Sequence, residues 1–449
     1  MDIASSAAAQ ERWPGSVASP PDECALFCLP YAGGDSTAFW HWRRALPAAV
    51  RVQFVELPGR DGRTADPGPI SPPDVAAVIA ARAPTPYAIY GHSMGARLAF
   101  ETVRELARLG APRPLRLYVG AAHPPHLPEP LARLAHATED DFVDQLIMRA
   151  GAPAALREDP DVRAALLPAL RADLDWLKRY RYRHDTALTV PVVAFAGTCD
   201  REVAADVMLG WARHTSGSFR LHTVAGDHLF IRTASDAVTS LIASDLGTAM
   251  AAHDGDGGPP ALPLPAPDEV HVWRVELDRL PGACSATGEL SAAETASAAA
   301  APDQVERRRY IGRCVVVRRL LRRYGADLRY RLSHSGGTVL VAFSRTGEVG
   351  VDVERLRPVA DFDAFCDRAL TPAERAEVAA EPEEAQLHAG LRFWTAKRAL
   401  RMATATGAAA AAGAGWRVRH LELDGVVGAL ATRQDDWRLR FETIVESPR

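Results

Sequence analysis

The chain has 449 residues, of which 47% are hydrophobic and 24% are charged, and its formal net charge is −4. This length exceeds what one hydrophobic core supports, so we expect two or three globular domains. The small negative charge gives no electrostatic basis for binding nucleic acid or a membrane surface, and neither is expected as a partner.

Residues 1–21 are rich in alanine, serine and proline and contain no continuous apolar run. They are predicted to be a flexible N-terminus and not a signal peptide, and no run elsewhere is long enough to cross a bilayer. The six cysteines are scattered and form no Cys-x-x-Cys pair. This pattern is typical of reduced thiols in a cytoplasmic protein.

Between residues 22 and 245, strand-like apolar runs alternate with helical patterns. The runs lie at 26–30, 51–57, 87–90, 116–121, 192–197 and 219–225. The alternation predicts an α/β domain with a mostly parallel sheet and helices on both faces. The segment 130–185 has no strand pattern and is rich in Ala, Leu and Arg, so we predict a helical insertion that forms a lid.

The segment Gly91-His92-Ser93-Met94-Gly95 directly follows the apolar run at 87–90 and precedes a helical pattern. Gly-x-Ser-x-Gly in a strand–turn–helix context is the nucleophile elbow of the α/β-hydrolases. The turn is so sharp that the flanking residues have no room for a Cβ atom. Ser93 is therefore the candidate nucleophile of an acyl-transfer or hydrolysis reaction.

A serine nucleophile needs an imidazole base, and a carboxylate must hold that imidazole in the correct tautomer. His228 stands in a loop after the last predicted strand, and Asp200 follows the strand at 192–197. Ser93, Asp200 and His228 occur in the chain order that the α/β-hydrolase fold requires. Asp227 is the alternative acid, although a residue adjacent to the histidine points poorly toward it. A loop histidine and a turn-forming aspartate are the structural alternatives.

The oxyanion of an acyl-transfer reaction needs two backbone donors. The amide of Met94, directly after the nucleophile, is the first candidate. The loop at 30–34, which contains two glycines, follows the first strand and supplies the second, for which Ala32 is the best candidate. The alternative interpretation of this loop is an ordinary turn.

These motifs, with two others, resemble the type II thioesterases of polyketide and nonribosomal peptide synthesis. The resemblance covers residues 24–245 and rests on Leu-Pro-Tyr-Ala-Gly-Gly (29–34), Leu-Pro-Gly-Arg (57–60), Gly-His-Ser-Met-Gly (91–95), Leu-Arg-Ala-Asp (170–173) and Gly-Asp-His-Leu-Phe (226–230). It implies a cofactor-free thioesterase that cleaves acyl groups from the phosphopantetheine arm of acyl or peptidyl carrier proteins. Ser93 would attack the thioester, His228 would transfer the proton and Asp200 would orient His228.

Residues 246–268 are dominated by glycine, proline and alanine and are predicted to be a linker. A second domain is expected over 269–449. It begins with an alternating strand at 270–277, followed by a basic helix; the segment 307–331 contains ten arginines and one acid. The basic segment is either a solvated helix face or an electrostatic seat for a phosphate-bearing ligand or acidic partner.

Asp352 and Glu354 lie two residues apart on a predicted strand, so both side chains point to one face. Two adjacent carboxylates repel each other unless a cation lies between them, and their oxygens suit Mg²⁺. The alternative interpretation is one edge of an exposed strand.

Three segments of this second domain resemble the broad-specificity phosphopantetheinyl transferases, and the fold expected is α+β. They are Ser-His-Ser-Gly-Gly (333–337), Gly-Val-Asp-Val-Glu (350–354) and Phe-Trp-Thr-Ala-Lys (393–397). The resemblance implies that Ser333 and His334 hold the 3′-phosphate of coenzyme A, that Asp352 and Glu354 bind Mg²⁺, and that Lys397 lies near the phosphates. The segment 371–374 also predicts a helix start with a capping box and proline at the first position.

The sequence departs from that family at three places. The family signature continues with a glutamate after the lysine, where this chain has Arg398. Met402 stands where a basic residue is typical, and the segment before Ser333 lacks the family's Gly-Lys-Pro. Arg398 puts a positive charge where a cation would be coordinated, which opposes metal binding unless the guanidinium meets the pyrophosphate directly.

We therefore expect a serine thioesterase fused to an impaired or repurposed transferase-like domain. Three alternatives stay open. The chain is a bifunctional enzyme with an active Mg²⁺-dependent transferase that uses coenzyme A, or its C-terminal domain is a carrier-protein docking module, or Ser93 releases its product by cyclisation or acyl transfer.

Overall fold

The computed structural model of the chain divides into two compact units. Unit 1 comprises Met1–Gly217 and His222–Asp256, and unit 2 comprises Ser218–Leu221 and Gly257–Arg449. The structure describes residues 23–58, 60, 70–83, 86–130, 138–150, 154–253, 262–325, 328–346, 348–404, 415–433 and 437–444. The expected flexible N-terminus at 1–21 lies outside these residues.

Unit 1 is built on strands that follow one another in the order β2-β1-β3-β4-β5-β6, and of β6 it includes residues 222–224. All six predicted strands are confirmed: β1 Cys24–Leu29, β2 Val50–Phe54, β3 Tyr87–His92, β4 Leu117–Gly120, β5 Val192–Gly197 and β6 Phe219–Val224. Strand β1 pairs in parallel with β2 and β3, and the parallel pairing continues through β4 to β5. The expected α/β-hydrolase architecture is confirmed.

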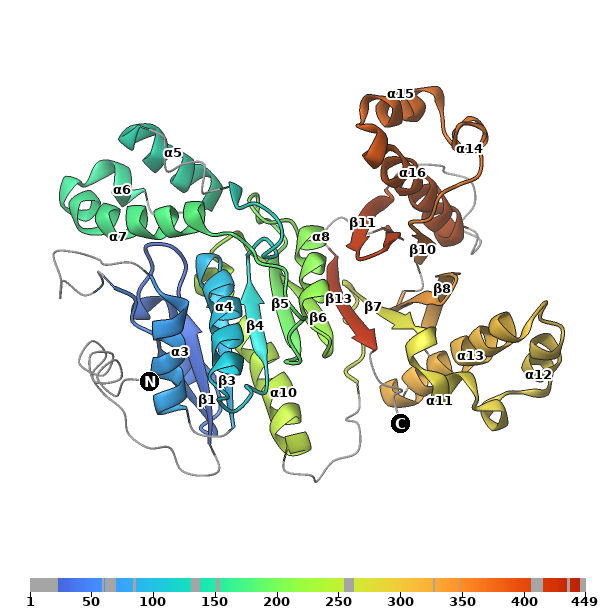
Figure 1. The fold of residues 1–449 in the computed structure, drawn as a ribbon, viewed down its shortest axis with the longest axis horizontal. Helices are drawn as coiled ribbons and strands as arrows, with labels where there is room; N and C mark the ends of the chain where they lie inside the picture. The colour runs from blue at the N-terminus through green and yellow to red at the C-terminus, as the bar shows by residue number, and fades with distance from the viewer. Residues whose placement is uncertain are drawn as a thin grey trace. The chain divides into compact units, whose positions relative to one another are not determined.

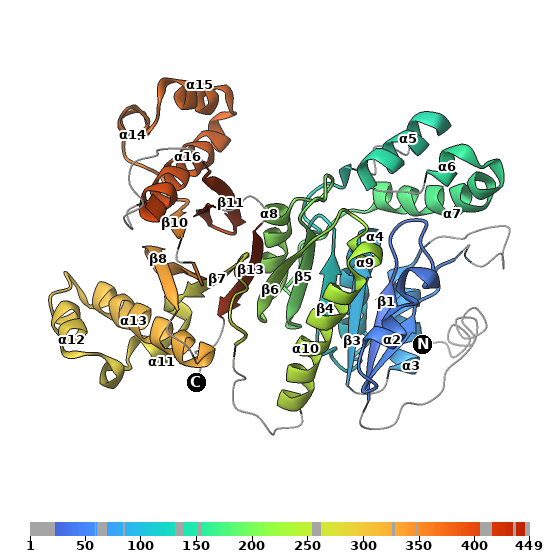
Figure 2. The same cartoon turned by 180° about the vertical axis from the view of Figure 1, so that it is seen from behind.

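Helices cover both faces of this sheet. Helices α3 (Pro72–Arg82) and α4 (Met94–Arg108) lie on one face, and α10 (Ser235–His253) lies on the other, as a comparison of Figures 1 and 2 shows. The predicted helical insertion contains α5 (Glu139–Ala150), α6 (Ala155–Glu158) and α7 (Pro160–Arg179). The remaining short helices are η1 Ser36–Phe39, α2 Trp42–Ala45, α8 Ala205–Met208, η3 Leu209–His214 and α9 Phe230–Thr233.

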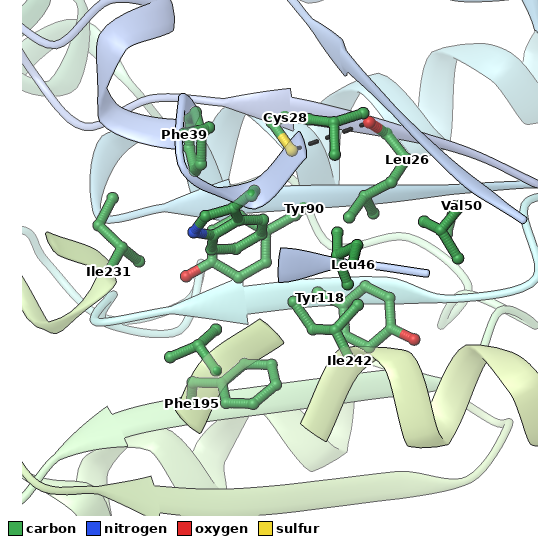
Figure 3. Close-up of a cluster of buried hydrophobic side chains, with 14 of the residues drawn as sticks. Leu26, Cys28, Phe39, Leu46, Val50, Tyr90, Tyr118, Phe195, Ile231 and Ile242 are labelled. Atoms are coloured by element: carbon green, nitrogen blue, oxygen red, sulfur yellow. Dashed lines mark hydrogen bonds between the residues drawn. The ribbon is translucent and has the colours of Figure 1, made fainter. Parts of the chain in front are cut away.

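An apolar core joins α10 to the sheet beneath the strand ends (Figure 3). Ile242 of α10 is fully buried in the same cluster as Tyr90, Tyr118 and Phe195 of the strands. Aromatic rings in this cluster meet edge to face, as for Phe39 and Tyr90 at a centroid distance of 5.8 Å. Close packing of this kind gives the loops at the strand ends a rigid base.

The linker prediction is wrong for its first part, because residues 246–253 continue helix α10. Leu246 and Ala249 are buried and extend the apolar face of that helix, so they favour helix over an open chain. Residues 254–261 lie outside the described residues. Leu262 is already part of the core of unit 2.

Unit 2 contains strands of two sheets. One set has the order β13-β7-β9-β8, formed by β7 Glu269–Glu276, β8 Arg329–Ser335, β9 Thr338–Ser344 and β13 Arg438–Ile444. The other has the order β10-β12-β11, formed by β10 Val349–Arg355, β11 Arg417–Leu423 and β12 Val426–Thr432, and it is antiparallel. The expected α+β character of this domain, its predicted strand at 270–277 and the predicted strand that carries Asp352 and Glu354 are confirmed.

The helices of unit 2 are α11 Pro281–Cys284, α12 Ala292–Ala299, α13 Gln304–Tyr324, α14 Phe362–Ala369, α15 Pro372–Ala380 and α16 Glu383–Thr404, with the short η4 Leu277–Arg279 and η5 Thr287–Glu289. The basic helix ends earlier than its segment suggested, because Gly325 adopts a left-handed conformation (φ 63°) that terminates α13. Arg329 and Arg331 therefore belong to β8. Among the described residues, no helix combines the length and apolar character needed to cross a membrane.

Candidate active site

Ser93 occupies a strained turn between β3 and α4. Its backbone has φ 54° and ψ −117°, a conformation that residues other than glycine rarely adopt. A Cβ atom on Gly91 would lie 2.1 Å from the carbonyl oxygen of Gly95, and one on Gly95 would lie 2.4 Å from those of Leu29 and Pro30. The predicted need for glycine on both sides of Ser93 is confirmed by these contacts.

The structure brings the three predicted triad side chains together from the ends of three strands. The Nε2 atom of His228 lies 3.0 Å from Oγ of Ser93, and its Nδ1 atom lies 3.0 Å from Oδ2 of Asp200. A carboxylate only accepts hydrogen bonds, so Nδ1 of His228 carries the proton and Nε2 is left as the acceptor for the serine hydroxyl. The arrangement is that of a nucleophile, a base and an orienting acid.

The environment sets the charges of the acid and the base. Burial alone would raise the pKa of Asp200, but His228 and the amides of Val203 and Glu202 bind its carboxylate and hold the pKa below its usual value. Burial lowers the pKa of His228, and the hydrogen bond and charge of Asp200 outweigh this effect and raise it. Asp200 thus stays ionised and stabilises a protonated His228.

The alternative acid, Asp227, does not serve His228 in this structure. Its Oδ1 atom accepts a hydrogen bond of 2.9 Å from the amide of Leu229. The side chain that binds the imidazole is Asp200.

A second histidine, His92, holds the backbone of the first. Its Nε2 atom lies 2.7 Å from the carbonyl oxygen of His228, and its Nδ1 atom lies 3.0 Å from the hydroxyl of Tyr90. A carbonyl only accepts, so Nε2 of His92 donates and Nδ1 accepts from Tyr90. Burial lowers the pKa of His92 to about 3, so this ring stays neutral and keeps both hydrogen bonds. No sequence motif predicts this role of His92.

The two candidate oxyanion donors both lie beside the nucleophile elbow. Met94 is the first residue of α4, where a backbone N–H has no acceptor within the helix. Ala32 lies in a turn closed by a 2.9 Å hydrogen bond from the amide of Gly34 to the carbonyl of Tyr31. The ring of Tyr31 meets His92 edge to face at 6.2 Å, which places this turn beside the elbow.

In unit 2, Arg398 lies against both carboxylates of the predicted metal pair. Its Nη1 atom is 2.7 Å from Oε1 of Glu354, and its Nε atom is 3.5 Å from Oδ1 of Asp352. Two serines of β8 satisfy the pair further, because Ser333 donates to Oδ1 of Asp352 at 2.7 Å and Ser335 donates to Oε2 of Glu354 at 2.9 Å.

In this conformation the carboxylate pair is bound by Arg398, whose charge opposes a magnesium ion. The described residues contain no group of three histidine, cysteine or acidic side chains arranged to hold a metal. Asp352 is fully buried, burial raises its pKa to about 6, and its Oδ2 atom has no hydrogen-bond partner. That single oxygen is the only feature favouring a cation among the described contacts of this pair, while Arg398 supplies the positive charge that the two carboxylates need.

The structure does not bring the three predicted coenzyme A ligands together. Ser333 is buried and bound to Asp352, whereas His334, the next residue on β8, is exposed on the opposite face of the strand. Lys397 donates to the carbonyl of Ala369 at 3.0 Å and forms an ion pair with Glu374. Glu374 is the third helical residue of α15, where the predicted capping box with Thr371 and proline at the first position is confirmed.

Acidic neighbours neutralise much of the basic helix α13. Arg309 binds Asp278 and Glu306, and a further group of arginines binds Glu289 or Glu294: Arg318, Arg319 and Arg322. For these four arginines the structure favours intramolecular ion pairs over a free electrostatic seat.

Comparisons with known proteins agree with this geometry. Residues 25–246 match the family model for the thioesterase domain, and residues 348–441 match that for the 4′-phosphopantetheinyl transferase superfamily. Linear gramicidin dehydrogenase LgrE of Brevibacillus parabrevis is 31% identical over 242 residues, which cover 52% of this chain and 92% of that protein. The chain belongs to the thioesterase family.

The thioesterase similarity extends to a Streptomyces protein and a solved structure. Thioesterase PikA5 of Streptomyces venezuelae is 35% identical over 219 residues, which cover 47% of this chain and 77% of that protein. The structure of the type II thioesterase BorB from the borrelidin biosynthetic cluster has 31% identity and a TM-score of 0.46, covering 51% of this chain and 94% of that one. The second family match lies within unit 2, so the chain joins a thioesterase to a domain of the transferase superfamily.

Proposed function

We propose that unit 1 is a serine thioesterase that hydrolyses acyl groups from the phosphopantetheine thiol of carrier proteins in polyketide or nonribosomal peptide biosynthesis. The hydrogen-bonded chain Ser93–His228–Asp200 carries this proposal, since it joins a nucleophile, a base and an acid in one line. The similarity to PikA5, which is named a thioesterase, supports the reaction, and the similarity to a linear gramicidin protein supports the biosynthetic setting. The reaction needs no cofactor.

The acylation step uses each of these residues. Oγ of Ser93 attacks the thioester carbonyl carbon while Nε2 of His228 takes the serine proton. The backbone amides of Met94 and Ala32 stabilise the negative carbonyl oxygen, aided by the positive end of the α4 dipole. The tetrahedral species collapses, the carbon–sulfur bond breaks, and the thiol leaves with the proton that His228 returns.

The deacylation step repeats this chemistry with water. His228 takes a proton from a water molecule, whose oxygen attacks the carbonyl carbon of the acyl-Ser93 ester. Collapse breaks the bond to Oγ of Ser93, His228 returns the proton to Oγ, and the free acid leaves. Asp200 stays ionised throughout and stabilises the protonated imidazole in both steps.

Ser93→Ala tests this proposal, with Ser240→Ala, an exposed position on α10, as the matched control. We expect Ser93→Ala to lower acyl release from an acyl-carrier thioester by at least about 10³-fold, with Ser240→Ala unchanged. Mass spectrometry of the carrier follows the loss of the acyl group, and the mass of the product separates hydrolysis from cyclisation or transfer. Turnover retained in Ser93→Ala would refute the role of Ser93.

We further propose that unit 2 is an impaired or repurposed phosphopantetheinyl-transferase-like domain. The position of Arg398 between Asp352 and Glu354 carries this proposal, because a guanidinium there repels a divalent cation. The pairing of Lys397 with Glu374, which removes the lysine from a phosphate-binding role, supports it as well.

A carrier-loading assay tests unit 2. The full chain is incubated with an apo carrier protein, coenzyme A and Mg²⁺, and an active transferase serves as the positive control for the carrier. We expect no gain in carrier mass with this chain. A gain that disappears in Asp352→Ala would overturn the proposal and establish the bifunctional enzyme. Binding of the carrier without a mass gain would support a docking module.

A further inference from the structure

An acidic residue of helix α7, in the helical insertion, reaches the loop that follows β1. Asp173 is 1% exposed, and its Oδ2 atom accepts a hydrogen bond of 2.7 Å from the amide of Gly33. The same oxygen forms an ion pair with Nη2 of Arg60. Burial raises the pKa of Asp173 to about 6 in spite of the nearby guanidinium, so this contact is largely shielded from water.

Arg60 connects the same carboxylate to a second point of the loop. Its Nε atom donates to the carbonyl oxygen of Gly34 at 2.9 Å, and its Nη1 atom donates to that of Pro58 at 3.1 Å. The Arg60 side chain is 5% exposed. Asp173 and Arg60 together therefore bind the amide of Gly33 and the carbonyl of the next residue, Gly34.

The segment held in this way is the turn that contains Ala32. The turn closes between Tyr31 and Gly34, and Gly33 takes the positive φ of +75° that the turn requires. Leu170, one helical turn before Asp173, packs so closely on Gly33 that a Cβ atom there would lie 3.2 Å from its Cδ1 atom. One face of α7 thus covers the turn through an apolar and an ionic contact.

The same loop lies directly against the nucleophile elbow. The carbonyl oxygens of Leu29 and Pro30 approach Gly95 to within 2.4 Å of an added Cβ position. The ring of Tyr31 contacts His92, the residue before Ser93. The loop therefore contacts the elbow on both sides of Ser93, Gly95 through its backbone and His92 through the ring of Tyr31.

We propose that Asp173 is a positioning residue that makes the oxyanion site depend on the seating of helix α7. With α7 in place, Asp173 and Arg60 fix the turn around Ala32; displacement of α7 removes the contact to Gly33 and leaves Arg60, which binds Gly34, without its carboxylate partner. The inference rests on the proposed thioesterase function, because the turn supplies an oxyanion donor there. It assigns a role to the Leu-Pro-Gly-Arg and Leu-Arg-Ala-Asp motifs, which that function left unused.

The prediction separates kcat from KM, because an oxyanion donor acts in the transition state and contributes little to binding of the substrate. We expect Asp173→Ala to lower kcat by about 10- to 100-fold, less than the full loss of one donor, with KM within about threefold of the wild-type value. The kcat of Asp173→Asn should lie between those of the wild type and Asp173→Ala. The asparagine amide oxygen still accepts the hydrogen bond from Gly33, but it carries no charge for Arg60. Asp175→Ala, at an exposed position of the same helix, is the matched control and should leave both constants unchanged.

Two measurements accompany the kinetics on the full chain, with an acyl-N-acetylcysteamine thioester as substrate. Amide hydrogen exchange of the peptide that spans residues 31–34 should accelerate in Asp173→Ala and stay unchanged in Asp175→Ala. Thermal unfolding gives the folded fraction at the assay temperature. If Asp173→Ala does not fold, Asp173→Asn and Arg60→Lys provide the same comparison with smaller perturbations.

A kcat of Asp173→Ala within about twofold of the wild-type value would overturn the proposal, since a lost donor contact has a larger effect. A loss of activity that the unfolded fraction explains entirely would also overturn it, as would unchanged exchange at 31–34. If the wild-type chain does not cleave the thioester, the proposed function fails, and the exchange measurement still decides whether Asp173 holds the loop.

Discussion

Replacing Asp200 by asparagine should reverse the hydrogen-bond polarity of the triad without altering its shape. Oδ1 of Asp200 accepts from the amides of Glu202 and Val203 at 2.8 and 3.0 Å. An asparagine must keep its carbonyl oxygen at that position, because its NH₂ group cannot accept. The opposite rotamer loses two hydrogen bonds, about 2 kcal/mol or roughly a 30-fold preference.

The NH₂ group of Asn at position 200 would then face Nδ1 of His228 and donate to it. The imidazole must in turn carry its proton on Nε2, the atom that has to accept the proton of Ser93. A base held in this wrong tautomer loses about 10⁴-fold in kcat, or roughly 5 kcal/mol of transition-state stabilisation. The loss should appear in kcat with the fold intact.

The assay compares steady-state hydrolysis of a small acyl thioester by Asp200→Asn and by a control variant, Asp227→Asn. Among the contacts described, the Asp227 side chain binds only the amide of Leu229. Asp227→Asn should stay within about threefold of the wild-type rate, as expected for a surface change outside the triad. In Asp200→Asn the pKa of His228 loses the contact that raises it, so the acidic limb of kcat/KM should move to lower pH. A loss of less than about tenfold, with that limb unmoved, would refute the triad geometry.

Two further changes test other parts of the structure. Tyr90→Phe removes the donor to Nδ1 of His92 and leaves a buried acceptor unpaired. The free energy of unfolding, measured by urea titration, should therefore fall by about 1–3 kcal/mol. An unchanged midpoint would contradict the assigned hydrogen bond. Arg398→Glu replaces the guanidinium bound to Asp352 and Glu354 by a third carboxylate. Mg²⁺ should therefore raise the melting temperature of this variant but not that of the wild type. Equal responses would contradict the conclusion that Arg398 opposes a cation at this pair.

The strands and the triad could be predicted from the sequence because each rests on a local pattern. Apolar runs mark the strands, and the fold places residues at successive strand ends on one edge of the sheet, where Ser93, Asp200 and His228 meet. The hydrogen bonds of His92 and the contacts of Asp173 could not be predicted in this way. They join residues 136 and 140 positions apart, and no spacing rule links those positions.

In unit 2, the family resemblance implied a set of coenzyme A ligands that the geometry of a strand does not allow. Neighbouring residues on a strand point to opposite faces, so Ser333 and His334 cannot both turn their side chains to one phosphate while they lie on β8. That constraint applies only because residues 329–335 form a strand, which the sequence pattern did not predict. The effect of Arg398 on the carboxylate pair, in contrast, could be predicted from the sequence. An arginine in place of the family's glutamate changes the local charge whatever the exact position of helix α16.

The backbone of Ser93 has one more consequence, for heat resistance. A non-glycine residue at φ 54° and ψ −117° stores about 1–3 kcal/mol that the rest of the fold must offset. Ser93→Gly would release that strain and also remove the hydroxyl. The released strain offsets the conformational entropy that a glycine normally costs on folding. The variant would then be inactive but would have a higher melting temperature, so stability and catalytic activity make opposite demands on this one position.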